Sequence, residues 1–183
     1  MKKAAVFFAD GFEEIEALTQ VDLLKRAGIQ ADMVTVNKGK KAVGAHNIKI
    51  ECDMTIDEIE KDGYDALILP GGMPGTKYLG QCKELTDLLL KYNSEGKIVA
   101  AICAAPSVLG ALGILKGKKA CCYPGFETML TGAEVVFEEC VREENVITSR
   151  GAGTAIEFAY VIIEALMGNE KAKEIKEEII YGH

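Results

Sequence analysis

The chain has 183 residues, of which 49% are hydrophobic, and this is enough for one domain with a substantial core spanning residues 1–183. It carries 21 basic and 28 acidic residues and no block of five like charges, which argues against nucleic acid or an anionic membrane as a partner. The first apolar run stops at Asp10 and is too short for a signal peptide, so we expect a cytoplasmic protein.

In chain order, the first half predicts a strand at 3–9, a helix at 13–27 with Gly28 after it, and a second strand at 29–36. A small hairpin at 42–51 follows, with Gly44 and Asn47 at its tip. A short helix at 56–61 then leads to a strand at 64–69, and helical segments are expected at 76–80 and 84–93.

The second half predicts a strand at 98–102 and a helix behind Cys103, with Pro106 in its first turn. We expect strands at 118–123, 133–136 and 141–148, the last interrupted by a turn at 143–145, and a loop or short helix at 124–131. A buried helix at 155–167, opened by Thr154 and Glu157 at capping-box spacing, precedes a charged surface helix at 170–181. The alternation predicts an α/β fold with a doubly wound, mostly parallel sheet and helices on both faces.

An uncharged run of 18 residues, 98–115, formally reaches the length of a membrane span. Pro106, Gly110 and Gly113 interrupt it, and a buried strand followed by a helix explains it better.

Six cysteines occur without a C-x-x-C pair, at positions 52, 82, 103, 121, 122 and 140. In a cytosolic chain of this size they are expected to be free thiols. Cys121 and Cys122 lie in a strand-like run, where neighbouring side chains point to opposite faces, so we expect no disulfide between them. Since the only histidines are His46 and His183, we predict no structural zinc site and no other metal site.

Cys103 lies where the predicted strand 98–102 turns into a helix. Small residues surround it, including Ala101 and Ala104, as a sharp turn needs if it is to present one side chain above a sheet. The N–H groups of the following helix favour a thiolate and predict a lowered pKa. Cys103 is therefore the candidate nucleophile, with a buried structural cysteine as the alternative.

Glu16 shares a helical stripe with the apolar residues of the helix at 13–27, at offsets that match Leu23, Leu24 and Ala27. Burial there would raise the pKa of this carboxyl group and keep it protonated. A solvated acid at the edge of the stripe explains the same spacing equally well.

Gly71 and Gly72 follow the predicted strand 64–69 directly after Pro70. Open α/β folds bind ligands at the carboxyl ends of their strands, so the two N–H groups can serve an anion or oxyanion there. A turn that needs positive φ explains the glycines without any chemistry.

Four segments together resemble one known family: ADGFEEIE at 9–16, LPGG at 69–72, AICAAP at 101–106 and TSRGAGT at 148–154. Their order and spacing are similar to those of the ThiJ/PfpI superfamily, in particular its DJ-one-like branch, over essentially the whole chain. The resemblance implies a flavodoxin-like fold, commonly a homodimer. It also implies that Cys103 is the elbow cysteine, that Glu16 is the protonated glutamate beside it, and that Gly71, Gly72 and the backbone of Ala104 line the same pocket.

Two departures from the family matter. Protease-like and amidotransferase-like relatives have a histidine directly after the elbow cysteine, where this chain has Ala104, and many DJ-one-like relatives have one where this chain has Tyr123. Both usual partners of a Cys-His dyad are missing, which disfavours a cysteine peptidase or amidase. Tyr123 remains a candidate for binding a substrate oxygen, and His46 is a candidate substitute for a family arginine.

Two functions of different class remain open. The first is a cofactor-independent glyoxalase or deglycase that acts on α-oxoaldehydes such as methylglyoxal and glyoxal, or on their adducts, through Cys103 and Glu16. The second is a non-enzymatic oxidative-stress sensor or redox-regulated chaperone that uses the same cysteine. A flavin-binding flavodoxin is disfavoured, because DGFEE replaces the phosphate-binding loop after the first strand.

Overall fold

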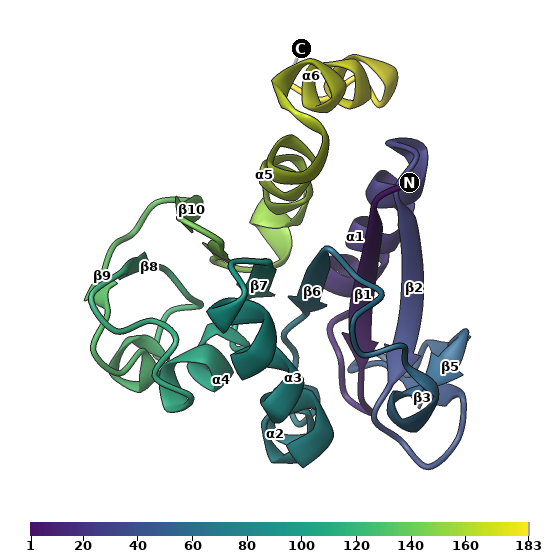
Figure 1. The fold of residues 1–183 in the computed structure, drawn as a ribbon, viewed down its shortest axis with the longest axis vertical. Helices are drawn as coiled ribbons and strands as arrows, with labels where there is room; N and C mark the ends of the chain where they lie inside the picture. Colours follow the sequence, from purple (N-terminus) through teal and green to yellow (C-terminus); the bar gives the residue numbers. More distant parts are fainter. Residues whose placement is uncertain (183) are drawn as a thin grey trace.

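The computed structural model describes residues 1–182. Its centre is a seven-stranded sheet in the order β10-β11-β7-β6-β1-β2-β5 (Figure 1). Every neighbouring pair is parallel except β10 and β11. The strands of this sheet are β1 (Lys3–Phe8), β2 (Gln30–Thr35), β5 (Met54–Thr55), β6 (Ala66–Leu69), β7 (Ile98–Ile102), β10 (Cys140–Glu143) and β11 (Val146–Ser149).

Two strand pairs lie outside this sheet. β3 (Lys41–Val43) and β4 (Lys49–Glu51) form the antiparallel hairpin that the sequence predicts. β8 (Lys119–Ala120) and β9 (Glu134–Val135) form a short parallel pair.

Helices cover both faces of the sheet, as the alternation of apolar side chains along β1 requires. Val6 points into the core that also contains Leu24 of α1 (Glu14–Arg26) and Phe158 of α5 (Ala155–Met167). Phe7 points the other way, into the core shared with Leu89 of α3 (Lys83–Ser94). The remaining helices are α2 (Gly75–Gln81), α4 (Pro106–Ala111) and α6 (Asn169–Glu178), and single turns of 3-10 helix occupy Ile56–Glu58, Glu127–Met129 and Ala152–Thr154. The predicted doubly wound α/β fold is confirmed.

The connections that follow β1, β6 and β7 meet at the carboxyl edge of the sheet. From β1 the chain proceeds through α1 to β2 on one side, whereas β6 and β7 lie on the other side. Such a reversal of strand order opens the crevice in which doubly wound folds bind ligands. The fold therefore brings Glu16, Gly71 and Cys103 to one place from three separate segments.

Two local predictions were wrong. The run at 118–123 forms only the two-residue strand β8, and the backbone N–H of Cys121 donates to Thr148 Oγ1 at 3.0 Å instead of joining a ladder. The predicted helix at 56–61 is one 3-10 turn, preceded by the short edge strand β5, which the sequence analysis missed.

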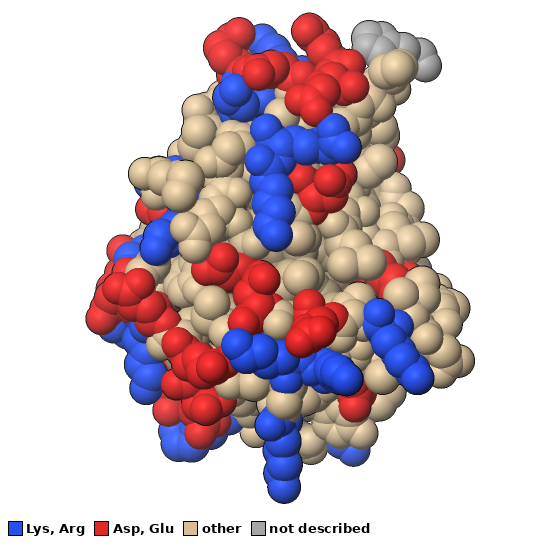
Figure 2. Space-filling view, turned by 90° about the vertical axis from the view of Figure 1, so that its right-hand side faces the viewer, with Lys and Arg blue, Asp and Glu red and all other residues tan. Residues whose placement is uncertain are grey.

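The uncharged run at 98–115 divides into β7 and α4 as predicted, with Pro106 as the first residue of its helix. Within residues 1–182, no helix combines the length and the apolar character that crossing a membrane requires. On the face shown in Figure 2, acidic and basic side chains are interspersed.

Candidate active site

Cys103 lies at a strained turn between β7 and α4. Its φ is 65°, a left-handed conformation that residues other than glycine rarely adopt. Neighbouring backbone holds it there: its N–H donates to Ser149 O at 3.0 Å, and its carbonyl accepts the N–H of Tyr123 at 2.9 Å. Strain of about 1–3 kcal/mol persists only where the surroundings enforce it, which is typical of functional sites.

Glu16 projects from the first turn of α1 and is only 1% exposed. Its Oε2 accepts the backbone N–H of Gly71 at 2.8 Å, and its carboxyl group is hydrogen-bonded to the thiol of Cys103. Burial raises the pKa of Glu16 to about 7, although the hydrogen bonds from Cys103 and Gly71 lower it. The sequence prediction of a buried carboxyl group on the apolar stripe is confirmed.

The pKa of the Cys103 thiol is not lowered as the sequence analysis expected, but raised to about 12. Burial is the main cause, and the charge of Glu16 and its hydrogen bond add to it. The N–H groups of Ala104 and Gly72 lower the thiol pKa but do not outweigh these effects. The N–H groups at the start of a helix are therefore not enough to lower the pKa of a thiol that is buried and faces a carboxylate.

Cys103 and Glu16 form a coupled pair, because each group disfavours ionisation of the other. Between the two steps, near pH 7 and pH 12, the pair carries one proton and one negative charge. That state includes a form in which Glu16 is protonated and donates to the thiolate. The pair can therefore present a nucleophile without a third ionisable partner.

Glycines form the walls around this pair because no side chain fits. A Cβ on Gly71 would lie 2.6 Å from Cys103 Cβ and 2.7 Å from Glu16 Oε2. Gly72 has φ of 88°, and a Cβ there would lie 2.4 Å from the backbone N of Glu13. The structure thus brings together Cys103, Glu16, Gly71, Gly72 and the N–H of Ala104, as the sequence analysis expected.

Tyr123 borders the same site from the loop before the Glu127–Met129 turn. A Cβ on Gly151 would lie 3.2 Å from Tyr123 Cδ2 and 3.9 Å from Glu16 Oε1, so Gly151 separates the ring from the carboxyl group. Tyr123 is 50% exposed, so part of its side chain is open to solvent.

His46 lies at the tip of the β3–β4 hairpin and contacts other residues. Its Nδ1 lies 2.8 Å from Glu14 Oε2 and 3.7 Å from Glu13 Oε2, and its backbone N–H donates to Glu14 Oε1 at 2.7 Å. Burial raises the pKa of Glu14, but the hydrogen bonds from His46 lower it overall. Within the described residues, no polar contact joins His46 to Cys103 or Glu16.

The possible ligand atoms of Glu13, Glu14 and His46 lie within 4.8 Å of one another, close enough for one metal ion. The hydrogen bonds between Glu14 and His46 explain this cluster without a metal, because they join α1 to the tip of the β3–β4 hairpin; we call this contact the hairpin clamp.

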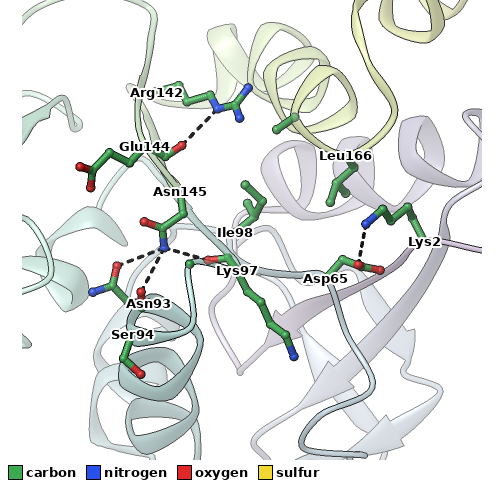
Figure 3. A pocket seen from close by; sticks show the side chains of 12 residues that line it. Lys2, Asp65, Asn93, Ser94, Lys97, Ile98, Arg142, Glu144, Asn145 and Leu166 are labelled. Atoms are coloured by element: carbon green, nitrogen blue, oxygen red, sulfur yellow. Dashed lines mark hydrogen bonds and ion pairs between the residues drawn. The ribbon is translucent and has the colours of Figure 1, made fainter.

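A hollow of about 690 Å³ lies at the amino ends of the strands, the end opposite to Cys103 (Figure 3). Its polar groups pair with one another: Lys2 Nζ lies 2.8 Å from Asp65 Oδ1, and Asn145 Nδ2 donates to Lys97 O at 2.9 Å and to Asn93 Oδ1 at 3.2 Å. These contacts hold connections at the amino ends of the strands, away from Cys103.

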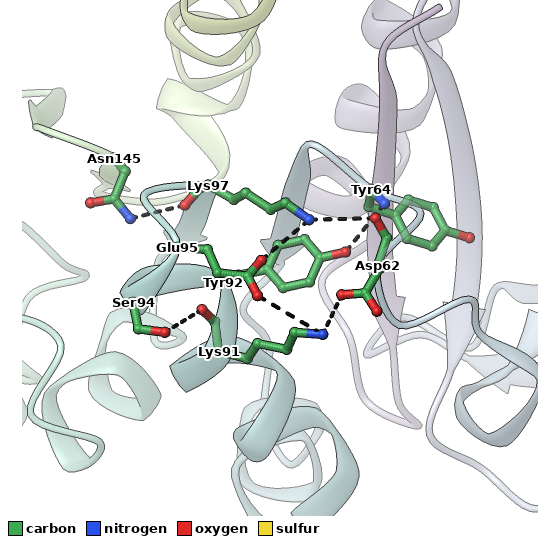
Figure 4. Close-up of polar contacts among 8 residues, drawn as sticks. All are labelled: Asp62, Tyr64, Lys91, Tyr92, Ser94, Glu95, Lys97 and Asn145. Carbon is green, nitrogen blue, oxygen red and sulfur yellow. Dashed lines mark hydrogen bonds and ion pairs between the residues drawn. The ribbon is translucent and has the colours of Figure 1, made fainter.

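A second group of contacts beside this hollow anchors the end of α3 (Figure 4). Lys91 pairs with Asp62, Lys97 Nζ lies 4.5 Å from the centre of the Tyr92 ring, and the N–H of Tyr64 donates to Tyr92 Oη at 3.2 Å. We interpret this edge of the sheet as structural.

The sequence analysis missed the support behind the elbow, formed by Ser149, Gly151 and Thr154. Thr154 makes no side-chain cap to its helix, so the predicted capping box with Glu157 is wrong. Its Oγ1 instead lies 2.7 Å from Ser149 Oγ and accepts the N–H of Gly151 at 3.1 Å. These bonds fix the segment whose carbonyl holds Cys103.

Residues 2–165 match the family model described as the DJ-1/PfpI family. The chain belongs to this family. It is 36% identical to Protein dj-1beta of Drosophila melanogaster over 184 residues, which cover 100% of this chain and 98% of that protein. It is 34% identical to the glutathione-independent glyoxalase DJR-1.2 of Caenorhabditis elegans over 164 residues, 89% of this chain and 87% of that protein.

Not all relatives have the same length. The chain spans 41% of Protein DJ-1 homolog B of Arabidopsis thaliana, at 36% identity over 181 residues that cover 98% of this chain. Among solved structures, Toxoplasma gondii DJ-1, oxidized, superposes with a TM-score of 0.96 at 34% identity and covers both chains completely.

All six cysteines of this chain are free thiols, as predicted.

Proposed function

We propose that this protein is a cofactor-independent glyoxalase that converts α-oxoaldehydes such as methylglyoxal and glyoxal into 2-hydroxy acids. The contact between the buried carboxyl group of Glu16 and the thiol of Cys103 carries the proposal, because it places a proton carrier beside a nucleophile. The 34% identity to a relative named as a glutathione-independent glyoxalase supports it. Protein deglycase activity on the adducts of the same aldehydes would use the same groups.

In the first step the Cys103 thiolate bonds to the aldehyde carbon, and the proton held by Glu16 passes to the aldehyde oxygen, which gives a hemithioacetal and leaves Glu16 as a carboxylate. Glu16 then removes the proton from that carbon and returns it to the neighbouring carbonyl carbon, while the hydroxyl proton passes to the oxygen of that carbonyl, so that the hemithioacetal becomes a thioester of the 2-hydroxy acid. Water hydrolyses the thioester and releases the free thiol. The sum is one oxoaldehyde and one water to one hydroxy acid, with no external oxidant or reductant.

Backbone donors stabilise the oxygen that becomes negative during these steps. The N–H groups of Gly72 and Ala104 face the sulfur, and preorganised donors of this kind contribute strongly in a site shielded from water. Tyr123, a half-exposed residue at the border of the site, is the side chain we propose to bind a substrate oxygen.

The test is steady-state formation of lactate from methylglyoxal by the purified protein. Wild type is expected to turn over, Cys103→Ser to be inactive, and Glu16→Gln to lose most turnover because an amide cannot carry the proton. Labelling with limiting iodoacetamide, followed by peptide mass spectrometry, is expected to modify Cys103 before the other five thiols. Turnover that persists in Cys103→Ser would rule out the mechanism.

A second function, redox sensing by the same cysteine, has a specific basis. The thiolate form of Cys103 faces backbone donors and the protonated Glu16, which can hold a sulfenic or sulfinic acid after attack on a peroxide. The similar Toxoplasma gondii structure is described as oxidized. Protein that consumes peroxide at Cys103 but forms no lactate would favour this function.

We also propose a homodimer, on the basis of family membership. Light scattering at micromolar concentration is expected to return twice the chain mass of 19.7 kDa, and a value equal to the chain mass would contradict it.

A further inference from the structure

An apolar groove of about 320 Å³ lies between α2 and α4, two helices that begin within a few residues of Gly72 and Cys103. Most of its lining is apolar, including Met73, Val108, Ala111, Phe126 and Met129, and the other lining residues are Thr76, Lys77, Gly80 and Ser107. Its size is at the lower end of the range of small-molecule sites, so it suits a short chain rather than a protein segment.

One wall of the groove is continuous with the donor at Gly72. Met73 follows Gly72 directly, and Met73, Thr76, Lys77 and Gly80 recur at helical spacing, so they share one face of α2 and its approach. The N–H of Thr76 donates to Gly72 O at 2.9 Å, which ties this wall to the backbone whose N–H faces the Cys103 sulfur.

The other wall is continuous with the donor at Ala104. Ser107, Val108 and Ala111 lie on the face of α4 that continues from Ala104 at intervals of three and four residues. Ser107 N–H and Oγ both donate to Ala104 O, at 3.1 Å and 2.6 Å. Both walls therefore start at residues that flank the thiol, and α4, which forms the second wall, is about 9 Å long.

A buried hydroxyl in the groove lining lacks a partner. Thr76 is 3% exposed, and its Oγ1 has no hydrogen-bond partner within residues 1–182. This oxygen is inaccessible to solvent, so it does not take part in binding, and the groove offers an occupant apolar contacts. Met73 and Met129, which are 54% and 50% exposed, leave the groove accessible from solvent.

We propose that this groove is the substrate subsite that receives the apolar side chain of a 2-oxoaldehyde larger than methylglyoxal. The reacting carbons would lie at Cys103, and an alkyl group would extend between α2 and α4 over Val108. This inference rests on the proposed glyoxalase activity for its substrate class, but the groove itself can be tested without turnover.

The first measurement is the rate of Cys103 alkylation by iodoacetamide and by N-hexyl iodoacetamide, each divided by its rate with glutathione. In wild type the hexyl reagent is expected to react about tenfold faster by this measure, because even one methylene in an apolar pocket changes discrimination about tenfold or more. Peptide mass spectrometry assigns the adduct to Cys103.

Two variants fill the groove from opposite walls, and one control does not. Ala111→Phe and Gly80→Leu are each expected to remove most of the hexyl preference. A Cβ on Gly80 would make ordinary contact with Val108 Cγ2 at 3.4 Å, so this change needs little rearrangement. Gln81→Phe adds bulk at the neighbouring position of α2, outside the groove lining, and is expected to keep the preference.

The second measurement is kcat/KM for 2-oxooctanal relative to methylglyoxal, which should fall in both filled variants but not in Gln81→Phe. A protein with the hexyl preference but no turnover of either aldehyde would overturn the glyoxalase function and leave the groove as a binding site. No hexyl preference in wild type, or an unchanged preference in folded Ala111→Phe and Gly80→Leu, would overturn the subsite whatever the turnover.

Discussion

Replacing Glu16 should change the pKa of Cys103 by an amount that the contact between them predicts. Two negative charges at about 4 Å, with an effective dielectric constant of about 20, repel by about 4 kcal/mol, which corresponds to about 3 in pKa. In Glu16→Gln this repulsion disappears and an amide donor remains. Burial, the main cause of the rise from 9.0 to about 12, remains in this variant, so we expect only part of that repulsion to appear and the thiol pKa to fall by about 1 to 2.

Comparing Glu16→Leu with Glu16→Gln separates the effect of the Glu16 charge from the effect of its hydrogen bond to the sulfur. It also removes the repulsion, but it leaves the thiolate without the side-chain hydrogen bond, which is worth about 1.5–3 kcal/mol, or about 1 to 2 in pKa. The expected order of thiol pKa is wild type highest, Glu16→Leu next and Glu16→Gln lowest. Glu16→Gln should nevertheless lose most turnover, because an amide carries no proton between carbons.

The assay is the thiolate absorbance near 240 nm against pH, with Cys103→Ser as the blank for the other five thiols. Circular dichroism at each end of the titration shows that the variants stay folded. Titrations of both Glu16 variants that coincide with wild type would refute the reasoning, since the carboxyl group would then not act on the sulfur.

Three further predictions concern the glycine wall, the buried acid and the hairpin clamp. Gly71→Ala should reduce kcat/KM about 100-fold, because a Cβ there would lie 2.6 Å from Cys103 Cβ, whereas Gly39→Ala, which has open space, should match wild type. The pKa of Glu16 rises on folding from 4.5 to about 7, and each pKa unit corresponds to about 1.36 kcal/mol. Urea titrations should therefore show that the free energy of unfolding falls by about 3 kcal/mol as pH rises from 4.5 to 7. The same fall in Glu16→Gln would contradict this prediction. Glu14→Ala should lower the free energy of unfolding by about 1 kcal/mol, the net contribution of a typical hydrogen bond, because it removes the contacts that join the hairpin to α1. Since the pKa of His46 is raised, its ion pair with Glu14 should be lost as pH rises through that pKa; equal stability of wild type and variant at all pH values would exclude the clamp.

The elbow and the buried acid could be predicted because each depends on a short, regular pattern. The apolar run 98–102 is a buried strand at this length, and Pro106 fixes where the next helix begins, so Cys103 had to lie in the turn between them. Glu16 could be placed because its offsets match the buried residues of α1. Both features are local in sequence.

Other parts of the site depend on contacts that local patterns do not encode. Gly151 has an extended φ of 164°, so no turn signal marks it, and its small size matters only because the Tyr123 ring lies 3.2 Å from where its Cβ would be. The run at 118–123 has strand-like composition, yet β8 finds only β9 to pair with, and the backbone of Cys121 bonds a side chain instead. Contacts between segments far apart in the sequence determine both the close approach at Gly151 and the short length of β8.

The pKa of Cys103 shows most clearly where local reasoning stops. From the sequence, the thiol faces a helix N-terminus, and this alone lowers a pKa. In the fold the same thiol is buried against Glu16, and these two effects raise its pKa more than the N–H groups of Ala104 and Gly72 lower it. Only the tertiary fold, which brings the first turn of α1 beside the turn that follows β7, places the acid next to the sulfur.

The effect of Cys103 and Glu16 on each other's pKa suits the proposed chemistry. Attack on an aldehyde needs Cys103 as a thiolate, and proton transfer needs Glu16 protonated, so the reactive form carries one proton and one negative charge. The thiol and carboxylate form carries the same proton and the same charge, and only the position of the proton along the hydrogen bond differs. Between the two steps near pH 7 and pH 12, the pair can therefore reach its reactive form without exchanging a proton with solvent, and the burial that raises both pKa values keeps that proton inside the site.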